Sequence, residues 1–165
     1  MTKNTRATAK SANTVIGACG EHYVAAYLSG SGLVVAMPRG GTSRFDLLVT
    51  KENGGRAIQV QVKTGTNPTR KTKAEGQIYL WRTSAGVLKW NDSNLWYAYV
   101  NLNNWPKGEH PPELFFVPSR VVIKCLKSEE EPWFWMYENN AKAYNDAGKY
   151  RGDSGLRALR HALNA

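Results

Sequence analysis

The segment from Phe45 to Lys63 constrains the fold of this chain more than any other segment. Two runs rich in Val, Ile and Leu flank Asn53-Gly54, and Asn-Gly between apolar runs is the strongest short-range signal for a β-hairpin. Both residues tolerate a positive φ, which a two-residue type I′ turn requires. A two-residue loop at Asn53-Gly54 places Asp46 directly opposite Gln61.

Alternation along the two predicted strands divides the hairpin into an apolar face and a polar face. The apolar face carries Phe45, Leu47, Val49, Ile58, Val60 and Val62. The polar face carries Asp46, Leu48, Thr50, Gln59, Gln61 and Lys63. We therefore expect one side of the hairpin to pack into the core and the other side to present polar groups.

An acid, an amide oxygen and an ammonium group converge at the open end of this hairpin. Opposed side chains have Cβ atoms about 5 Å apart, so the Asp46 carboxylate and the Gln61 amide oxygen could hold one hard cation such as Mg²⁺, which takes oxygen ligands. Lys63 follows Gln61 on the same face. A polar hairpin face is most often merely solvated, and the convergence of these three groups is what favours a catalytic site.

This arrangement resembles the restriction-endonuclease-like superfamily, whose PD-(D/E)xK signature places an Asp before an acid-x-Lys. Gln61 in place of the second acid is similar to the Mrr-type restriction endonucleases, which have Gln-x-Lys. Upstream, residues 17–28 resemble the first helix of the archaeal Holliday-junction resolvases and their bacterial relatives, with a Gly, then Glu21, then Ala-x-Tyr-Leu. The resemblance is good over residues 15–65 and loose over the rest of the chain.

The resemblance implies an α/β fold with a central mixed β-sheet flanked by helices, in the order αβββαβ. It implies a metal-dependent endonuclease that hydrolyses phosphodiester bonds of branched or foreign DNA. Mg²⁺ or Mn²⁺ would be bound by Asp46, the Gln61 side-chain oxygen and the Val62 backbone carbonyl. Glu21 would act through water or as a further ligand, and Lys63 would orient the attacking water. Resolvases of this superfamily work as dimers, so the resemblance also implies a homodimer.

The neutral side chain of Gln61 keeps a second function open. Asp46 and Gln61 together contribute one negative charge, so cation affinity should be lower than with two carboxylates unless Glu21 compensates. The alternative to an enzyme is a DNA-binding or assembly module that retains the nuclease fold without hydrolysis. An RNA-directed nuclease would use the same chemistry as a deoxyribonuclease, and the sequence does not separate the two.

The charge of the chain favours a polyanionic partner. Its formal net charge is +9, from 22 basic and 13 acidic residues, which supplies electrostatic steering and phosphate contacts. We expect DNA contacts from two loops that flank the predicted site, at Arg39, Ser43, Arg44, Thr64, Arg70, Lys71 and Lys73. Residues 1–13 have the composition of a disordered basic arm, and residues 14–165 are expected to form a single domain.

The remaining composition restricts the cellular setting. Cys19 and Cys125 are too few for a disulfide framework and lack the spacing of a metal site. We expect core thiols in a reducing compartment, hence a cytoplasmic protein. Apolar runs fall short of the roughly 18 residues of a membrane span, so no membrane partner is expected.

Hydrophobic periodicity predicts the other elements. We expect a first helix at 14–28 and strands at 33–37, 77–81, 94–102, 113–117 and 133–137. Residues 64–76 are expected to form a long polar loop. A short helix at 120–126 would be capped by Ser119. A last helix, capped by Asp153 or Ser154, would pack the stripe formed by Leu156, Leu159 and Leu163 on the sheet.

Overall fold

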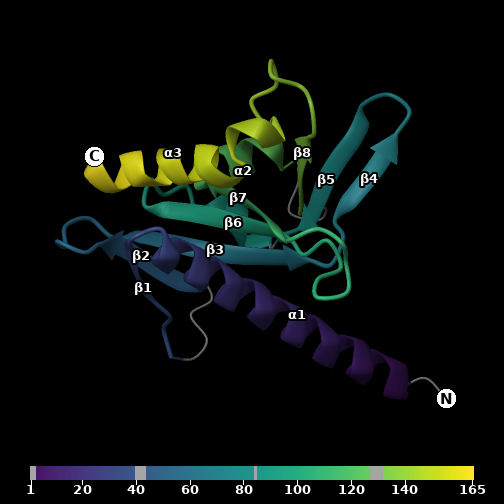
Figure 1. The fold of residues 1–165 in the computed structure, drawn as a ribbon. Coiled ribbons are helices and arrows are strands. Elements are labelled where there is room, and N and C mark those ends of the chain that lie inside the picture. Colours follow the sequence, from purple (N-terminus) through teal and green to yellow (C-terminus); the bar gives the residue numbers. More distant parts are fainter. Residues whose placement is uncertain (1–2, 40–43, 84, 127–131) are drawn as a thin grey trace.

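The computed structural model describes residues 3–39, 44–83, 85–126 and 132–165, which form two β-sheets and their covering helices (Figure 1). The larger sheet has the order β1-β2-β3-β6-β7. Its strands are β1 (Leu33–Ala36), β2 (Leu47–Lys51), β3 (Ile58–Gly65), β6 (Leu95–Asn101) and β7 (Glu113–Pro118). The smaller sheet has the order β4-β5-β8, with β4 (Thr69–Thr72), β5 (Gly76–Arg82) and β8 (Trp133–Tyr137). The helices are α1 (Lys3–Gly30), α2 (Ser119–Cys125) and α3 (Gly152–Asn164), with short 3-10 turns η1 (Ala85–Lys89) and η2 (Ala147–Lys149).

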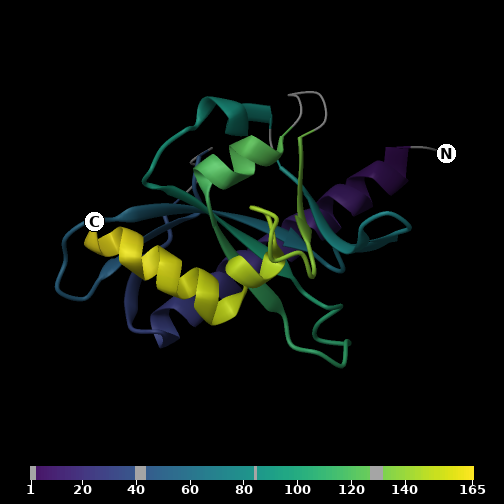
Figure 2. The same cartoon turned by 90° about the horizontal axis from the view of Figure 1, so that it is seen from above.

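The larger sheet is mixed and lies between two apolar layers. Strands β3 and β6 are parallel, and the other neighbours in this sheet are antiparallel. Helices α1 and α3 cover one face, where Val24, Leu28 and Leu159 pack against the apolar side chains of β2 and β3. The smaller sheet, α2 and η1 cover the other face (Figures 1 and 2). The predicted fold class, a central mixed sheet flanked by helices, is confirmed.

The predicted pairing of the central hairpin is confirmed, although its turn differs. Leu47 pairs with Val60 and Val49 with Ile58, and all four side chains are fully buried on the helix-covered face. The Gly54 N–H donates to the Lys51 carbonyl (3.0 Å), so the turn begins earlier than expected. Its left-handed residues are Gly54 (φ 76°) and Gly55 (φ 100°). Phe45 precedes β2 and packs against the opposite cluster, which corrects its predicted face.

Helix α1 is longer than the sequence analysis predicted. It begins at Lys3 instead of Thr14, so residues 3–13, expected to be a disordered arm, continue the helix. The segment contains neither Pro nor Gly before Gly17, and a helix that has nucleated extends through such residues at little cost. Residues 1 and 2 of the expected arm lie outside the described residues.

Three local predictions are wrong in detail. The polar segment 64–76 contains strand β4, which pairs with β5, instead of being all loop. Helix α2 has Pro118 at its N-cap, and the Ser119 hydroxyl donates to the Asp92 carbonyl (2.7 Å) instead of capping. Helix α3 begins after Arg151 without a side-chain cap from Asp153 or Ser154, while its leucine stripe is buried as expected. For Ser119, a contact with a residue distant in sequence replaces the predicted cap.

Both cysteines are free, with Cys125 buried and Cys19 half-buried, as expected of core thiols. Burial raises the pKa of Cys125 to about 11. Among the described residues, no helix is long and apolar enough to cross a membrane.

Candidate active site

Asp46 stands at the open end of the β2–β3 hairpin and is fixed to β3 by two hydrogen bonds. Its N–H donates to the Val60 carbonyl (2.9 Å), which continues the strand pairing by one residue. Its Oδ2 atom accepts the Val62 N–H (2.7 Å), in place of a backbone carbonyl. The carboxylate is therefore held against the β3 backbone, between the positions of Gln61 and Lys63. The paired register ends at Leu47 and Val60, and Asp46 binds the β3 backbone on either side of Gln61, so their direct pairing stays a prediction.

The Gln61 side chain is only 5 % exposed, and its Oε1 atom is buried with no hydrogen-bond donor among the described residues. A buried polar atom without a partner costs about 1–3 kcal/mol, so such an atom needs a physical explanation. Gln59 Oε1, two residues earlier on the same face, is also buried without a partner. Gln59 lies opposite Leu48, whereas Gln61 lies between the two residues of β3, Val60 and Val62, that hydrogen-bond Asp46. The amide oxygen of Gln61 and the carboxylate of Asp46 are oxygen ligands of the type that Mg²⁺ and Mn²⁺ prefer.

Lys63 follows Gln61 on the same face of β3 and carries a partly desolvated amino group. Burial lowers the pKa of Lys63, and the nearby Asp46 and Glu21 carboxylates partly oppose this effect. A lysine amine in such surroundings is close enough to both acids for direct electrostatic interaction. Titratable groups that lie together and shift one another's pKa are found at functional sites.

Glu21 reaches the hairpin because α1 packs closely on β3 at the preceding residue. A Cβ atom on Gly20 would lie 1.8 Å from Thr64 Oγ1, so only glycine permits this approach. Burial raises the pKa of Glu21, and the negative charge of Asp46 raises it further. Asp46, Lys63 and Glu21 are thus close enough to interact electrostatically, and Gln61 lies on β3 two residues before Lys63. No group of three or more His, Cys, Asp or Glu side chains within the described ranges could hold a metal ion, so a cation here would depend on the Gln61 oxygen.

The expected DNA-contacting residues differ in their surroundings. Arg39 is exposed, whereas Arg44 forms an ion pair with Asp92. The Thr64 hydroxyl is buried against α1 and faces the helix instead of solvent. Ser43 lies outside the described residues.

The other expected contacts lie on the β4–β5 hairpin, which projects from the body of the molecule (Figure 1). Arg70 and Lys71 are on β4, Lys73 is in the following turn, and all three are exposed. Strand β4 is the edge of the smaller sheet. Their charges are therefore free to meet phosphate groups that approach this hairpin.

Two tyrosines next to the candidate site, Tyr97 and Tyr99 on β6, are not predicted by the sequence analysis. In the parallel pairing of β3 with β6, Tyr97 is the partner of Gln61 and Tyr99 the partner of Lys63. Both hydroxyls are buried without a hydrogen-bond partner among the described residues, and burial raises the pKa of both tyrosines. The two tyrosines lie beside Gln61 and Lys63 on the neighbouring strand, and their rings belong to the apolar cluster on that side of the sheet. The sequence contains no local signal for this contact, because parallel strands are joined by a distant crossover.

Comparisons with known proteins support the fold. No protein-family model matches the sequence, and no curated protein matches it. The structure is similar to that of the bacterial homing endonuclease I-Ssp6803I, with a TM-score of 0.56 and 18 % sequence identity. The chain has a nuclease-like fold. The match covers 92 % of this chain and 96 % of the endonuclease chain, so the likeness extends over nearly the whole length of both.

Proposed function

We propose that this protein is an endonuclease that hydrolyses DNA phosphodiester bonds with the help of Mg²⁺ or Mn²⁺. The observation that carries the proposal is the buried oxygen of Gln61, which has no hydrogen-bond partner among the described residues. Gln61 lies on β3 between the two residues that hydrogen-bond Asp46, and two residues before Lys63. The nuclease-like fold of the chain also supports it.

The residues present fit a hard divalent cation. Asp46, the Gln61 side-chain oxygen and the Val62 backbone carbonyl would hold it, with Glu21 as a further oxygen ligand directly or through water. When bound, the cation supplies polarisation of a phosphate oxygen and a lower pKa for a water molecule. The hydrogen bond from the Val62 N–H keeps the Asp46 carboxylate in place whether or not the cation is present.

The chain's own groups then act on the phosphate and the attacking water. Lys63 donates hydrogen bonds to the water and stabilises the negative charge that develops on the phosphate oxygens. Its partial burial strengthens this electrostatic effect because less solvent screens it. Glu21, whose pKa is raised, would accept a hydrogen bond from the same water.

A cleavage assay tests the proposal. Each protein, wild type, Lys63→Ala or Asp46→Ala, is incubated with Mg²⁺ or Mn²⁺ and one nucleic acid. The nucleic acids are supercoiled, linear, branched and single-stranded DNA, and a single-stranded RNA. We expect cleavage of DNA by wild type and a loss of at least about 100-fold in both variants. Lys51→Ala is the matched control, because Lys51 lies at the other end of the hairpin, where its Nζ atom donates to Asn164 Oδ1 (2.9 Å). If both site variants cut DNA at the wild-type rate, the site is misassigned.

The second candidate is a DNA-binding module without hydrolytic activity. It is favoured by one observation, the neutral Gln61 at a position where a carboxylate would strengthen cation binding. A protein of this kind would bind DNA in the same assay, leave every substrate intact, and bind no Mn²⁺ at Asp46.

A further inference from the structure

The loop between β6 and β7 exposes an indole ring near the candidate site. Trp105 is 45 % exposed, and Lys107 on the same loop is exposed as well. A single exposed aromatic residue is common on protein surfaces, so exposure by itself decides nothing. The construction of the loop and its position are what distinguish this tryptophan.

The backbone of the loop is tightly folded. Asn103 (φ 50°) and Asn104 (φ 60°) both have left-handed backbone conformations, which non-glycine residues adopt at some cost. The Trp105 N–H donates to the Leu102 carbonyl (2.7 Å). A Cβ atom on Gly108 would lie 1.8 Å from the Asn103 carbonyl oxygen, so the loop closes on itself there. These contacts hold Trp105 in one backbone position.

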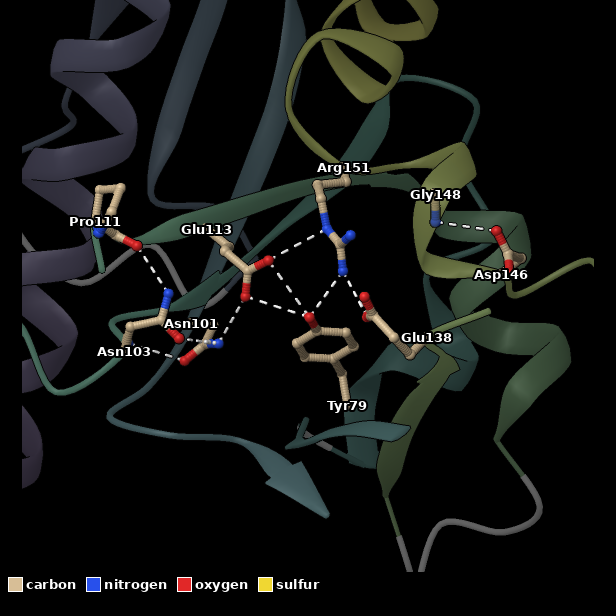
Figure 3. Close-up of polar contacts among 9 residues, drawn as sticks. All are labelled: Tyr79, Asn101, Asn103, Pro111, Glu113, Glu138, Asp146, Gly148 and Arg151. Carbon is tan, nitrogen blue, oxygen red and sulfur yellow. Dashed lines mark hydrogen bonds and ion pairs between the residues drawn. The ribbon is translucent and has the colours of Figure 1, made fainter. Parts of the chain in front are cut away.

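Two asparagines close the base of the loop (Figure 3). The amide group of Asn101, which is buried, donates to Asn103 Oδ1 (2.7 Å) and to Glu113 Oε2 (2.9 Å). The Asn103 amide group donates to the Pro111 carbonyl (2.7 Å). Glu113 is also a partner of Tyr79, so the same hydrogen-bond network ties the loop to the smaller sheet. The backbone of the loop that carries Trp105 is therefore tied to the rest of the fold.

The loop lies at the end of β3 that carries the candidate site. The Leu102 N–H donates to the Gly65 carbonyl (2.9 Å) and the Asn104 N–H to the Thr66 carbonyl (2.9 Å). Thr66 follows Lys63 closely, at about 10 Å along an extended chain. Successive nucleotides of one DNA strand are about 3.4 Å apart along the axis. A base within a few nucleotides of the reacting phosphate is thus within reach of Trp105. Both views place this loop on the same side of the molecule as the β4–β5 hairpin (Figures 1 and 2).

We infer that Trp105 stacks on an unpaired base, and that the enzyme prefers DNA in which a base near the scissile phosphate is unpaired. This inference rests on the proposed function, because it names the DNA structure that the same site would take. An exposed indole on a hydrogen-bonded loop, two residues before the exposed Lys107, is suited to base stacking. An intact duplex keeps its bases stacked on one another, so Trp105 would meet only its backbone.

The test compares two DNA duplexes that differ only in a short unpaired bubble, with 2-aminopurine at the unpaired position. Binding is measured without divalent cations, so that no cleavage occurs. For Trp105→Ala we expect affinity for the bubble DNA to fall by about 5- to 150-fold and the stacking-induced quenching of 2-aminopurine fluorescence to disappear. Affinity for the intact duplex should stay the same, and Trp105→Phe should restore most of the quenching.

The matched control is Trp133→Ala, because Trp133 is 43 % exposed but lies on strand β8. It should behave as wild type with both DNA molecules. The inference is overturned if Trp105→Ala binds and quenches as wild type does, or if its affinity falls equally for both duplexes. Thermal unfolding of each variant shows whether the loop change has altered the fold. A wild-type protein that binds neither DNA overturns the proposed function instead, and so the two failures are distinguishable.

Discussion

Lys63 shows at the scale of one residue how a functional group lowers stability. Its amine is partly buried, and burial outweighs the attraction of the Asp46 and Glu21 carboxylates, so that its pKa is lowered in the folded protein. The unfolded chain therefore binds this proton more tightly than the folded chain does. By linkage, the protonated Lys63 amine lowers the free energy of unfolding of the wild-type protein at neutral pH. This loss disappears as pH rises toward 10.5.

Replacing this amine with an apolar side chain of similar length should stabilise the protein. We expect Lys63→Met to unfold at a higher temperature than wild type at pH 7, while cleavage is abolished. The difference should shrink as pH rises from the lowered pKa toward 10.5, where the wild-type amine has released its proton. Thermal unfolding at about pH 7 and about pH 10 measures both effects, with Lys51→Met as control. A Lys63→Met protein that is less stable than wild type at neutral pH would contradict the assignment of Lys63 as a desolvated cation.

At the scale of elements, the contact of α1 with β3 positions Glu21. Gly20→Ala would force a Cβ atom against Thr64 Oγ1, so we expect a decrease of about 1–3 kcal/mol in the free energy of unfolding. Cleavage should fall as well, because the displaced helix carries Glu21 with it. Urea unfolding and the cleavage assay give the two values.

Gly17→Ala is the matched control on the same helix. No atom lies within 4 Å of a Cβ built there, so the substitution should raise stability by up to about 1 kcal/mol through helix propensity. Equal effects of the two substitutions would show that α1 does not approach β3 as described.

The β4–β5 hairpin is the second element with a role of its own. A triple variant tests this role by changing three residues to Gln, namely Arg70, Lys71 and Lys73. We expect it to bind DNA more weakly, with an affinity that depends less on salt concentration. The slope of log K against log salt concentration should fall by about 0.9 for each phosphate group that the variant no longer neutralises. Binding is measured between about 50 mM and 200 mM salt, the range in which such charge neutralisation is most visible.

A control triple variant removes the same charge elsewhere. Lys124, Lys142 and Lys149 are exposed and lie on α2 and on the segment before α3. Changing them to Gln should leave the salt slope near that of wild type. If both triple variants change the slope equally, net charge alone attracts DNA, and the hairpin is not a contact surface.

At the scale of the whole molecule, one arginine joins the two sheets to α3 (Figure 3). The Arg151 guanidinium donates to the Tyr79 hydroxyl (2.7 Å) and to Glu138 Oε2 (2.5 Å), and it forms an ion pair with Glu113 (3.3 Å). Its removal leaves two carboxylates around a buried tyrosine without a cation.

We expect Arg151→Met to reduce the free energy of unfolding by on the order of 2 kcal/mol, the range for hydrogen bonds to charged groups. Arg157→Met on α3 should change it little, because Arg157 is exposed and donates only to Ser154 Oγ among the described residues. Urea unfolding compares the two variants. An Arg151→Met protein as stable as wild type would show that the sheets are held together by their apolar contacts alone.

The sequence predicts the hairpin of the candidate site better than it predicts the contacts around that hairpin. The pairing of Leu47 with Val60, which ends next to Asp46, follows from alternation and one turn signal, both of which act within the hairpin. The early start of α1 was missed because a polar composition suggested disorder while the helix continued. The contacts of Tyr97, Thr64 and Arg44 depend on a parallel strand pair, a helix crossing and an ion pair with Asp92. These are long-range contacts, which no local pattern predicts.

The most direct test of the account is Mn²⁺ binding by wild type, Gln61→Ala and Gln59→Ala. Both glutamines lie on one face of β3 with a buried, unpartnered oxygen among the residues described, and Gln61 is the one that lies between the two residues that hydrogen-bond Asp46. We expect Gln61→Ala to weaken Mn²⁺ binding by at least about tenfold, while Gln59→Ala binds Mn²⁺ as wild type does. Equal affinity in all three proteins, or no binding by wild type, would contradict it.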